Sequence, residues 1–321
     1  MCFQKISHKT LSLSYYLEYQ TDNQVKEKEM HEFHKITSML PKDYREPVKQ
    51  LPENLLLHVE EIRLICGQRI CLRGNGIERF LDPIVTMEDL NRILHNLIQY
   101  SYYAYEKDLA SGFVTIEGGH RVGICGHVVI KQGEPALIQE ISSLNIRFAK
   151  EVKGCSDGIF HTCVKDGKLM NVLIVSPPGC GKTTLLRDFA RNYANHGYRV
   201  GLCDERSELA GMYHGKPSFD IGSRTDVLDG CEKAFGIPML IRSMAPQVII
   251  TDEIGKPEDI SAIHQCLISG VALVTSIHGS DERDVLHSAI GSLAKNGTFQ
   301  RYIYLTSNGG VGTIREVASS V

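Results

Sequence analysis

One glycine-rich loop constrains this chain more than any other feature of its sequence. Residues 176–184 read Ser-Pro-Pro-Gly-Cys-Gly-Lys-Thr-Thr and directly follow an apolar run over residues 172–175. The residues after the loop repeat at helical spacing, with one apolar side made of Leu185, Leu186, Phe189, Ala190 and Tyr193. A glycine-rich loop between a buried strand and an amphipathic helix is the setting in which such loops bind phosphate. The sequence therefore predicts an α/β domain with a phosphate-binding loop.

The residue types in this loop give its positions predicted roles. Glycines let the main chain wrap tightly, so that several N–H groups point at phosphate oxygens, and the helix N-terminus adds the positive end of its dipole. We expect Lys182 to reach the β- and γ-phosphates of ATP, and the Thr183 hydroxyl to contact Mg²⁺. Ser176 stands where such loops usually begin with glycine. Because serine is small and can turn, we expect the loop to form.

Acidic side chains follow two further apolar runs. The run 248–251 ends in Asp252 and Glu253, and the run 200–203 ends in Asp204 and Glu205. The carboxyl ends of parallel strands meet at one edge of a sheet, beside a bound phosphate. We expect Asp252 to hold Mg²⁺ together with Thr183. Glu253 is expected to orient the attacking water, with Glu205 and Asp204 as the alternatives for that role.

The predicted nucleotide-binding residues therefore span the loop and one acid. They are Ser176, Pro177, Pro178, Gly179, Cys180, Gly181, Lys182, Thr183, Thr184 and Asp252.

A histidine and several arginines are further candidates for this site. His278 ends the apolar run that begins at Val271, so it belongs to the same expected sheet edge. Two interpretations stay open for it, a sensor of the γ-phosphate and a structural histidine. Five arginines lie near turns that contain glycine or serine, namely Arg121, Arg147, Arg206, Arg224 and Arg242. Each alone is typical of a surface or salt-bridge arginine. As a group they fit a ring in which one subunit's arginine reaches the next subunit's nucleotide.

The hydrophobic pattern divides the chain into two parts. After Asn171 the apolar runs lack polar alternation, which is typical of parallel strands buried on both faces, and helical patterns separate them. Before that point, a strand pair around Gly67, a helix after Thr86 and a hairpin across Gly118-Gly119 predict a mixed α+β domain. We expect a polar extension over 1–34, the α+β domain over 35–150, a linker over 151–168 and the α/β domain over 169–321.

Composition excludes some classes of function. The chain has 321 residues and a net charge of −3, so a nucleic-acid partner is not expected, because such proteins usually carry a basic excess. None of the ten cysteines has C-x-x-C spacing, and their apolar surroundings, for example at Cys71 and Cys125, predict buried, reduced thiols. No apolar run reaches the ~18–20 residues of a membrane-spanning helix. We expect a soluble, cytoplasmic chain.

Four motifs occur in an order that resembles a known superfamily. The loop is followed by DERSE (204–208), IRSMAPQVIITDEIG (241–255) and TSIHG (275–279). This order is similar to the Walker A motif, Asp box, Walker B motif and His box of the type II and type IV secretion ATPases. The acidic pair reads Asp-Glu here and Glu-Asp in those enzymes. The tetracysteine zinc motif of the type II enzymes is absent from the sequence.

A closer resemblance, over about residues 35–320, is to the stage III sporulation AA family of endospore-forming bacteria. The segments that carry it are EIRL (61–64), TIEGGHRVG (115–123), SLNIR (143–147) and RTDVLDGC (224–231). By resemblance, Arg121 and Arg147 match arginines of the N-terminal domain that approach the nucleotide in secretion ATPases. Ordinary salt bridges with local acids such as Glu117 or Glu140 are the alternative for both arginines.

The resemblance implies a fold and a function. It implies a RecA-like P-loop NTPase domain with a mainly parallel sheet, preceded by a smaller α+β N-terminal domain. It implies an ATP-hydrolysing homohexameric motor that uses ATP and Mg²⁺ and lies in the mother-cell cytoplasm. The motor would associate with the membrane through integral membrane components of a sporulation channel to the forespore. The expected catalytic residues are Glu253, Glu205, Asp204, His278, Arg121 and Arg147.

Two other classes of function remain open. One is a nucleic-acid-dependent P-loop ATPase, which the near-neutral pI of about 6.5 and the lack of an aromatic and basic platform disfavour. The other is a nucleotide-gated assembly scaffold that hydrolyses ATP at a negligible rate.

Overall fold

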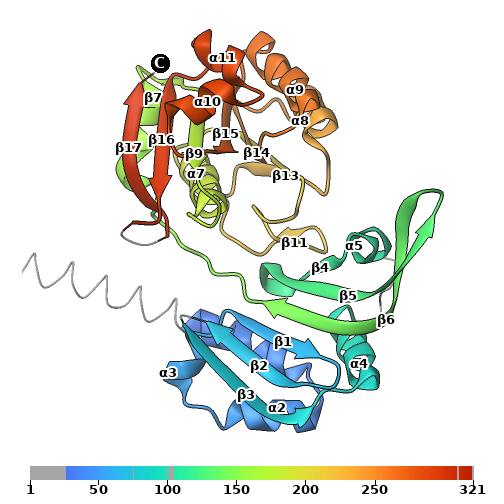
Figure 1. Cartoon of the computed structure of the whole chain (residues 1–321). Coiled ribbons are helices and arrows are strands. Elements are labelled where there is room, and N and C mark those ends of the chain that lie inside the picture. The colour runs from blue at the N-terminus through green and yellow to red at the C-terminus, as the bar shows by residue number, and fades with distance from the viewer. Residues whose placement is uncertain (1–26, 75, 100, 102–104, 309–310, 320–321) are drawn as a thin grey trace, which may run out of the picture. The chain divides into compact units, whose positions relative to one another are not determined.

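The computed structural model describes residues 27–74, 76–99, 101, 105–308 and 311–319 (Figure 1). The chain divides into two compact units, with unit 1 ending at Lys150 and unit 2 beginning at Glu151.

Unit 1 is built around an antiparallel sheet with the strand order β3-β2-β1-β6-β5-β4. The strands are β1 (Glu61–Ile65), β2 (Arg69–Gly74), β3 (Ile77–Ile84), β4 (Phe113–Ile116), β5 (His120–Lys131) and β6 (Glu134–Arg147). Its helices include α2 (Lys42–Lys49), α3 (Glu53–Leu56), α4 (Met87–Leu97) and α5 (Glu106–Ala110), and a 3-10 turn, η2 (Glu117–Gly119), joins β4 to β5.

The elements predicted for unit 1 are present. Strands β1 and β2 pair across a turn at Gly67, whose φ of +78° favours glycine. The Thr86 hydroxyl caps α4 by accepting the N–H of Asp89 at 3.1 Å. Strands β4 and β5 form the predicted antiparallel hairpin.

The start of unit 1 differs from the expectation. Residues 27–38 are helical, whereas their polar composition predicts an extension up to residue 34. The helix is fixed by two buried side chains, Phe33 and Ile36, which are 4% and 1% exposed. The Phe33 ring lies 5.0 Å from the ring of Phe148, more than a hundred positions later. Residues 1–26 lie outside the described residues.

Unit 2 contains a seven-stranded sheet with the order β13-β10-β14-β15-β9-β16-β17. Its strands are β9 (Val172–Ser176), β10 (Val200–Asp204), β13 (Thr225–Asp229), β14 (Val248–Glu253), β15 (Ala272–His278), β16 (Arg301–Thr306) and β17 (Thr313–Ser319). All neighbours are parallel except β16 and β17, which form the predicted terminal hairpin. The flanking helices are α7 (Lys182–Asn195), α8 (Lys233–Met244), α9 (Pro257–Ile268), α10 (Glu282–His287) and α11 (Gly291–Lys295). A short hairpin, β11 (Met212–Tyr213) and β12 (Lys216–Pro217), lies between β10 and β13.

Two apolar cores cover the two faces of this sheet. Along β9, Val172 and Ile174 belong to the core under α7, while Leu173 and Val175 belong to the core under α8 and α9. Alternate side chains of a strand point to opposite faces, so a strand between two cores is apolar at every position. The helical layers on both faces are visible in Figure 1.

The first residues of unit 2 are structured, whereas a linker was expected over 151–168. They form α6 (Asp157–Phe160), a 3-10 turn η3 (His161–Cys163), and a small hairpin of β7 (Val164–Lys165) and β8 (Lys168–Leu169). The buried carboxylate of Asp188 on α7 accepts the N–H of Gly154 at 3.0 Å and the N–H and hydroxyl of Ser156 at 2.7 Å each. Arg191 donates to the same carboxylate at 2.6 Å. These bonds attach the segment that enters unit 2 to α7.

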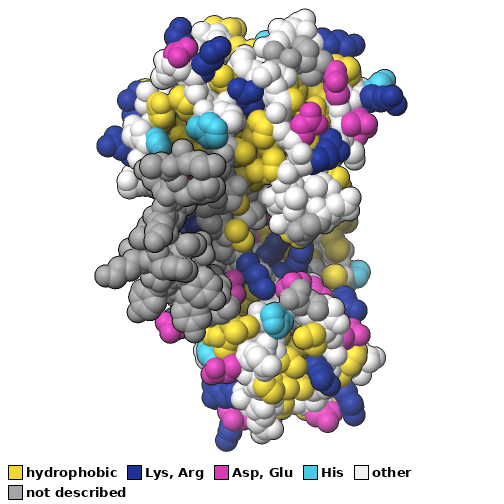
Figure 2. Space-filling model, turned by 90° about the vertical axis from the view of Figure 1, so that its left-hand side faces the viewer, with side chains coloured by type: hydrophobic (Ala, Val, Ile, Leu, Met, Phe, Trp, Pro, Cys, Tyr) yellow, Lys and Arg dark blue, Asp and Glu magenta, His cyan; other side chains and the backbone are white. Residues whose placement is uncertain are grey.

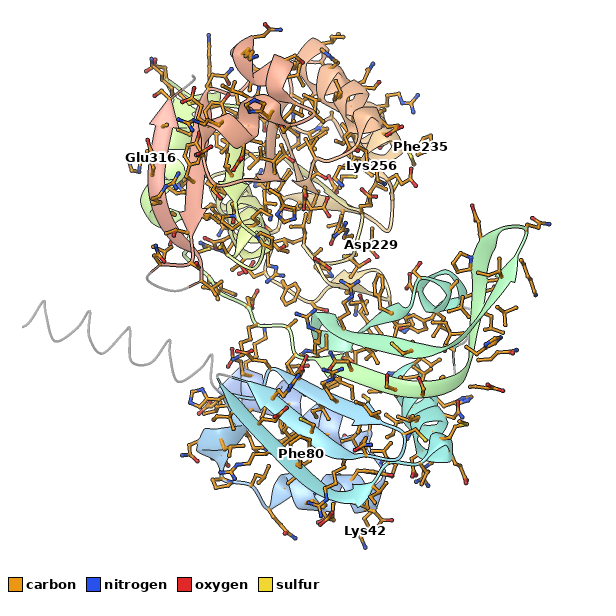
Figure 3. All side chains as sticks on the ribbon, viewed as in Figure 1. Lys42, Phe80, Asp229, Phe235, Lys256 and Glu316 are labelled. Atoms are coloured by element: carbon orange, nitrogen blue, oxygen red, sulfur yellow. The ribbon has the colours of Figure 1, made fainter. Side chains whose placement is uncertain are left out.

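The surface carries charges of both signs. On the face in Figure 2, Lys and Arg side chains of each unit are interspersed with acidic and hydrophobic ones. Phe235 is 66% exposed and points outward from α8 (Figure 3). No helix of the described residues is long and apolar enough to cross a membrane. The described cysteines are free, but Cys125 is exposed and not buried as expected, because it faces away from the core that its neighbour Ile124 enters.

Candidate functional site

The loop between β9 and α7 has the conformation that its glycines permit. Gly179 and Gly181 adopt φ values of +73° and +90°, which side-chain-bearing residues rarely adopt. A Cβ on Gly181 would also lie 3.1 Å from the main chain of Gly312. The N–H of Gly312 donates to the Cys180 carbonyl at 3.0 Å. The loop therefore favours glycine at both positions, and most strongly at Gly181.

Ser176 replaces the usual first glycine without strain. Its φ is not among the positive values found in this loop. Its buried hydroxyl donates to the Pro177 carbonyl at 2.8 Å, so the extra polar atom is satisfied locally. Its own carbonyl accepts the N–H of Gly279 at 3.2 Å. Serine at this position is compatible with the loop.

Lys182, His278 and Glu253 form one chain of contacts at the carboxyl edge of the sheet. Lys182 Nζ lies 2.7 Å from His278 Nδ1, and His278 Nε2 lies 2.7 Å from Glu253 Oε2. Strand β15 lies between β9 and β14, so the histidine at its end stands between the lysine and the glutamate. Three residues that the sequence predicts separately are brought together here.

Hydrogen-bond chemistry sets the direction of this chain. A lysine ammonium only donates, so His278 Nδ1 accepts from Lys182 and His278 Nε2–H donates to Glu253. Burial lowers the pKa of Lys182, although the carboxylate of Glu253 acts in the opposite direction. The His278 side chain is 47% exposed and the Glu253 side chain is 30% exposed, so this row of three contacting residues is open to solvent.

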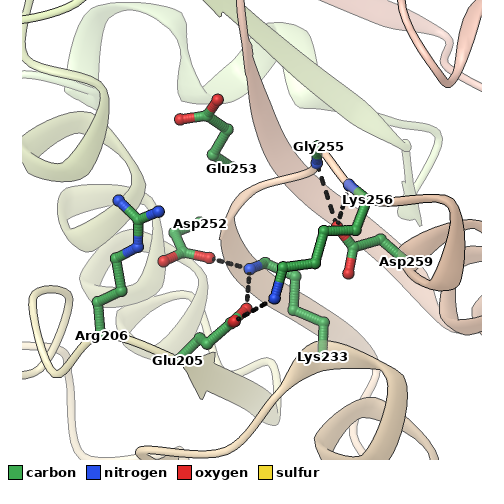
Figure 4. A pocket seen from close by; sticks show the side chains of 8 residues that line it. All are labelled: Glu205, Arg206, Lys233, Asp252, Glu253, Gly255, Lys256 and Asp259. Atoms are coloured by element: carbon green, nitrogen blue, oxygen red, sulfur yellow. Dashed lines mark hydrogen bonds and ion pairs between the residues drawn. The ribbon is translucent and has the colours of Figure 1, made fainter. Parts of the chain in front are cut away.

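A polar pocket lies next to Glu253 and contains a second set of charged side chains. Its lining residues are Glu205, Arg206, Lys233, Asp252, Glu253, Gly255, Lys256 and Asp259 (Figure 4). Lys233 Nζ lies 2.6 Å from Asp252 Oδ1 and also contacts Glu205 Oε2. Lys256 Nζ lies 3.2 Å from Glu205 Oε1.

Asp252 and Glu253 turn in different directions although they are consecutive. Successive side chains of a strand point to opposite faces, and β14 also shifts register against β15 between Ile250 and Glu253. Asp252 therefore contacts Lys233, as Figure 4 shows. Glu253 contacts His278 instead.

The charged side chains in the pocket shift one another's pKa values. Burial tends to lower the pKa of Lys233, but Asp252 and Glu205 outweigh it and the pKa is raised. Burial raises the pKa of Asp252 against the opposing effect of Lys233. For Glu205, burial is outweighed by Lys233 and Lys256, which lower its pKa. Lys233 is thus a fixed cation and Glu205 a fixed anion.

Asp204 lies outside the pocket. It is fully buried, and its carboxylate accepts the N–H groups of Glu208, Leu209 and Ala210 at 2.9 Å each. Burial raises its pKa to about 6 despite these bonds. The sequence places Asp204 with Glu205 as an alternative water-orienting acid. Its oxygens are instead committed to the turn over 205–210, because strand alternation turns it away from Glu205.

The residues proposed for Mg²⁺ fit that ion only in company with phosphate. Thr183 and Asp252 supply a hydroxyl and a carboxylate, the oxygen ligands that Mg²⁺ prefers. Among the described residues, no group of three or more His, Cys, Asp or Glu side chains is arranged to hold a metal ion. Mg²⁺ commonly binds through one or two protein ligands plus substrate phosphates, which matches this donor set.

Arg121 and Arg147 are neighbours in unit 1. They are direct partners in the β5–β6 register, so their side chains share one face of the sheet. The Arg121 guanidinium also lies 3.6 Å from the centre of the Phe113 ring. Glu117, one acid that could have paired with them, forms an ion pair with Lys35. Of the other candidates, Arg206 lines the pocket, whereas Arg224 and Arg242 are exposed.

Sequence reasoning missed both lysines of the pocket. Lys233 is the first residue of α8, and Lys256 precedes α9. The sequence could have pointed to them. Two acids expected at one sheet edge need a nearby cation, and both lysines follow strands that end at that edge. The order of the strands was required to choose between them and the other lysines.

Comparison with known proteins identifies the family of this chain. The family described as "Sporulation stage III, protein AA" matches residues 31–320. The chain belongs to this family. The stage III sporulation protein AA of Bacillus subtilis (strain 168) is 38% identical over 288 residues, which cover 88% of this chain and 94% of that protein.

Solved structures similar to this family member share its fold. The pilus retraction motor PilT, solved with bound ADP, has a TM-score of 0.54 and 17% identity, covering 76% of this chain and 73% of PilT. The Legionella pneumophila ATPase DotB has a TM-score of 0.52 and 16% identity, covering 77% of this chain and 71% of DotB. These likenesses support the predicted RecA-like α/β fold with its mainly parallel sheet.

Proposed function

We propose that this protein is an ATP-hydrolysing motor of the secretion-ATPase type. The chain Lys182–His278–Glu253 is the observation that carries the proposal. It joins the lysine of a phosphate loop, a candidate γ-phosphate sensor and a candidate water-orienting acid within single hydrogen bonds. A phosphate loop alone supports binding, whereas hydrolysis also needs a group that activates water.

In this proposal each residue has one task. Lys182 leaves His278 to bind the β- and γ-phosphates, and the free N–H groups of the loop and of α7 hold the phosphate oxygens. Glu253 accepts a hydrogen bond from the attacking water. His278, released from Lys182, faces the γ-phosphate. Thr183 and Asp252 would hold Mg²⁺, which would supply positive charge against the phosphate oxygens.

Glu253 is preferred to the other acids because of what surrounds each one. Glu205 is engaged by Lys233 and Lys256, and Asp204 by three main-chain N–H groups. Among the described residues, the ion pair of the Glu253 carboxylate is with His278, a histidine that ATP would reposition.

The decisive experiment compares two variants in single-turnover assays. Glu253→Gln should keep ATP affinity and lower hydrolysis at least ~10²-fold, the scale of a lost general base. Lys182→Ala should lose most of its ATP affinity, because it removes the charge that bridges the phosphates. Near-normal turnover by Glu253→Gln would move the role to Glu205. Negligible turnover by the wild type would support the nucleotide-gated scaffold instead, and stimulation by single-stranded DNA would support the nucleic-acid-dependent ATPase.

We also propose that Arg121 and Arg147 complete the site across a subunit boundary of a homohexamer. A RecA-like domain leaves one side of the triphosphate open, and an arginine supplied there is commonly worth ~10³–10⁵ in rate. The two arginines share one face of the sheet in unit 1, so the same surface would present both of them to a neighbouring subunit. The partners of the ring would be integral membrane components of a sporulation channel, which the cytoplasmic motor energises.

Mixing tests the contact between subunits. Arg121→Ala and Lys182→Ala proteins should each be poor ATPases alone, by ~10³-fold for the arginine variant. Mixed rings contain interfaces with an intact loop on one side and an intact Arg121 on the other, so activity should partly return. Mixed rings that form, as native mass measurement would reveal, and stay inactive would refute action in trans.

A further inference from the structure

Lys233 is a cation placed where local rules disfavour one. It is the first residue of α8, and positive charge at a helix N-terminus opposes the helix dipole. Its side chain is only 5% exposed, and a buried ammonium is costly unless it is paired. Both penalties fall on the same group, so the contacts that it makes must compensate for them.

Those contacts are with the two acids that face the pocket. Lys233 Nζ lies between Asp252 Oδ1 and Glu205 Oε2. Without the ammonium, these carboxylates would form a half-buried pair of like charges, with side chains 15% and 19% exposed. Such a pair attracts a divalent cation. Arg206 also lines the pocket, and Lys256 reaches Glu205 from a side chain that is 59% exposed.

We propose that Lys233 is a positioning residue that acts as a tethered cation and keeps free divalent metal away from Asp252 until nucleotide arrives. Metal then enters only with the phosphates, whose oxygens supply the ligands that the protein lacks. The naming of Asp252 as the metal-binding acid rests on the proposed function. The inference that metal is excluded from the nucleotide-free protein does not depend on that function.

The test measures Mn²⁺ binding to the full-length protein without nucleotide, by electron paramagnetic resonance and by thermal unfolding in MnCl₂. The wild type should bind no Mn²⁺ in the pocket. Lys233→Gln, which keeps a hydrogen-bond donor but removes the charge, should bind about one Mn²⁺ per chain. At ten times its dissociation constant, the metal should raise the unfolding midpoint of the variant by roughly 3 °C.

Matched variants separate metal exclusion from general damage. Lys233→Arg keeps the charge and should remain metal-free. Lys256→Gln removes an exposed lysine from the same pocket and should also remain metal-free. A folded Lys233→Gln protein that ignores Mn²⁺ would overturn the proposal. If that variant does not fold, the wild type decides alone, because Mn²⁺ binding to its Asp252–Glu205 pair without nucleotide would also overturn it.

A parallel measurement keeps the two proposals distinguishable. Binding of a fluorescent ATP analogue to the wild type tests the proposed function directly. Absence of nucleotide binding would reject that function and leave the Mn²⁺ result to decide the role of Lys233. Normal nucleotide binding with a metal-silent Lys233→Gln protein would reject only the inference about Lys233.

Discussion

Two lysine–acid arrangements lie at the same sheet edge and differ in how they are built. Lys182 reaches Glu253 through a histidine, and the His278 side chain is 47% exposed. Lys233 contacts Asp252 directly, and its own side chain is 5% exposed. The first arrangement is exchangeable, because water or a ligand can replace each hydrogen bond. The second is fixed, because separating its charges would leave them buried and unpaired.

This difference indicates that the two arrangements at one sheet edge have different roles. The groups that the proposed function requires to release their partners, Lys182 and Glu253, contact each other through the exposed His278, where hydrogen bonds exchange at little net cost. Groups that hold the geometry are buried, where an ion pair cannot be broken cheaply. Consecutive residues of β14 serve the two arrangements, so a single strand supplies both the exchangeable and the fixed acid.

The largest expected effect is on stability, and it would break the fixed arrangement. Lys233→Met should lower the free energy of unfolding by about 3–5 kcal/mol, since removal of one partner leaves buried carboxylates uncompensated. His278→Ala should cost less than about 1 kcal/mol, because its contacts are exposed. Urea unfolding at neutral pH measures both. Equal losses in the two variants would contradict the distinction.

An intermediate effect is expected on catalysis, from the exchangeable arrangement. His278→Ala frees Lys182 and leaves the γ-phosphate without its proposed sensor, so kcat should fall roughly tenfold or more. Affinity for ATP should be unchanged or higher, because Lys182 no longer has a competing partner. Binding and turnover measured on the same preparation check this. Wild-type kcat would return His278 to the structural interpretation.

The smallest effect concerns Asp204, which should behave as a structural acid. Burial raises its pKa from 3.8 to about 6. The folded protein then holds this proton more tightly than the unfolded chain, so the contribution of the group to stability falls as pH rises from about 3.8 to about 6. Asp204→Asn does not titrate and should lack this fall, as urea unfolding across that window would measure. Its turnover should drop much less than the ~10² of a lost general base.

Much of the site could be predicted because strand ends carry it. The loop at Lys182, the acids Asp252 and Glu253, and His278 each follow an apolar run, and parallel strands bring such ends to one edge. The strand pair at Gly67 and the helix at Thr86 could also be predicted, because turns and helix caps depend on neighbouring residues in the sequence.

What could not be predicted depends on contacts that the chain order hides. Lys233 meets Asp252 only because β10, β13 and β14 are neighbours, with α8 between β13 and β14 along the chain. Asp204 and Glu205 look equivalent in sequence, and strand alternation separates them. The helix over 27–38 is held by Phe33 against Phe148, a distant pairing that its polar local composition does not reveal.

The carboxylate of Asp188 has a mechanical consequence. It sits on the helix that begins at the phosphate loop, and its hydrogen bonds grip Gly154 and Ser156, only a few residues after the chain leaves unit 1. These hydrogen bonds measure 2.7–3.0 Å and Asp188 is 2% exposed, so water has little access to compete for them. A displacement of α7 on phosphate binding would pull directly on the strap of chain between the units. The helix that begins at the phosphate loop thus also holds the first residues of unit 2 in place.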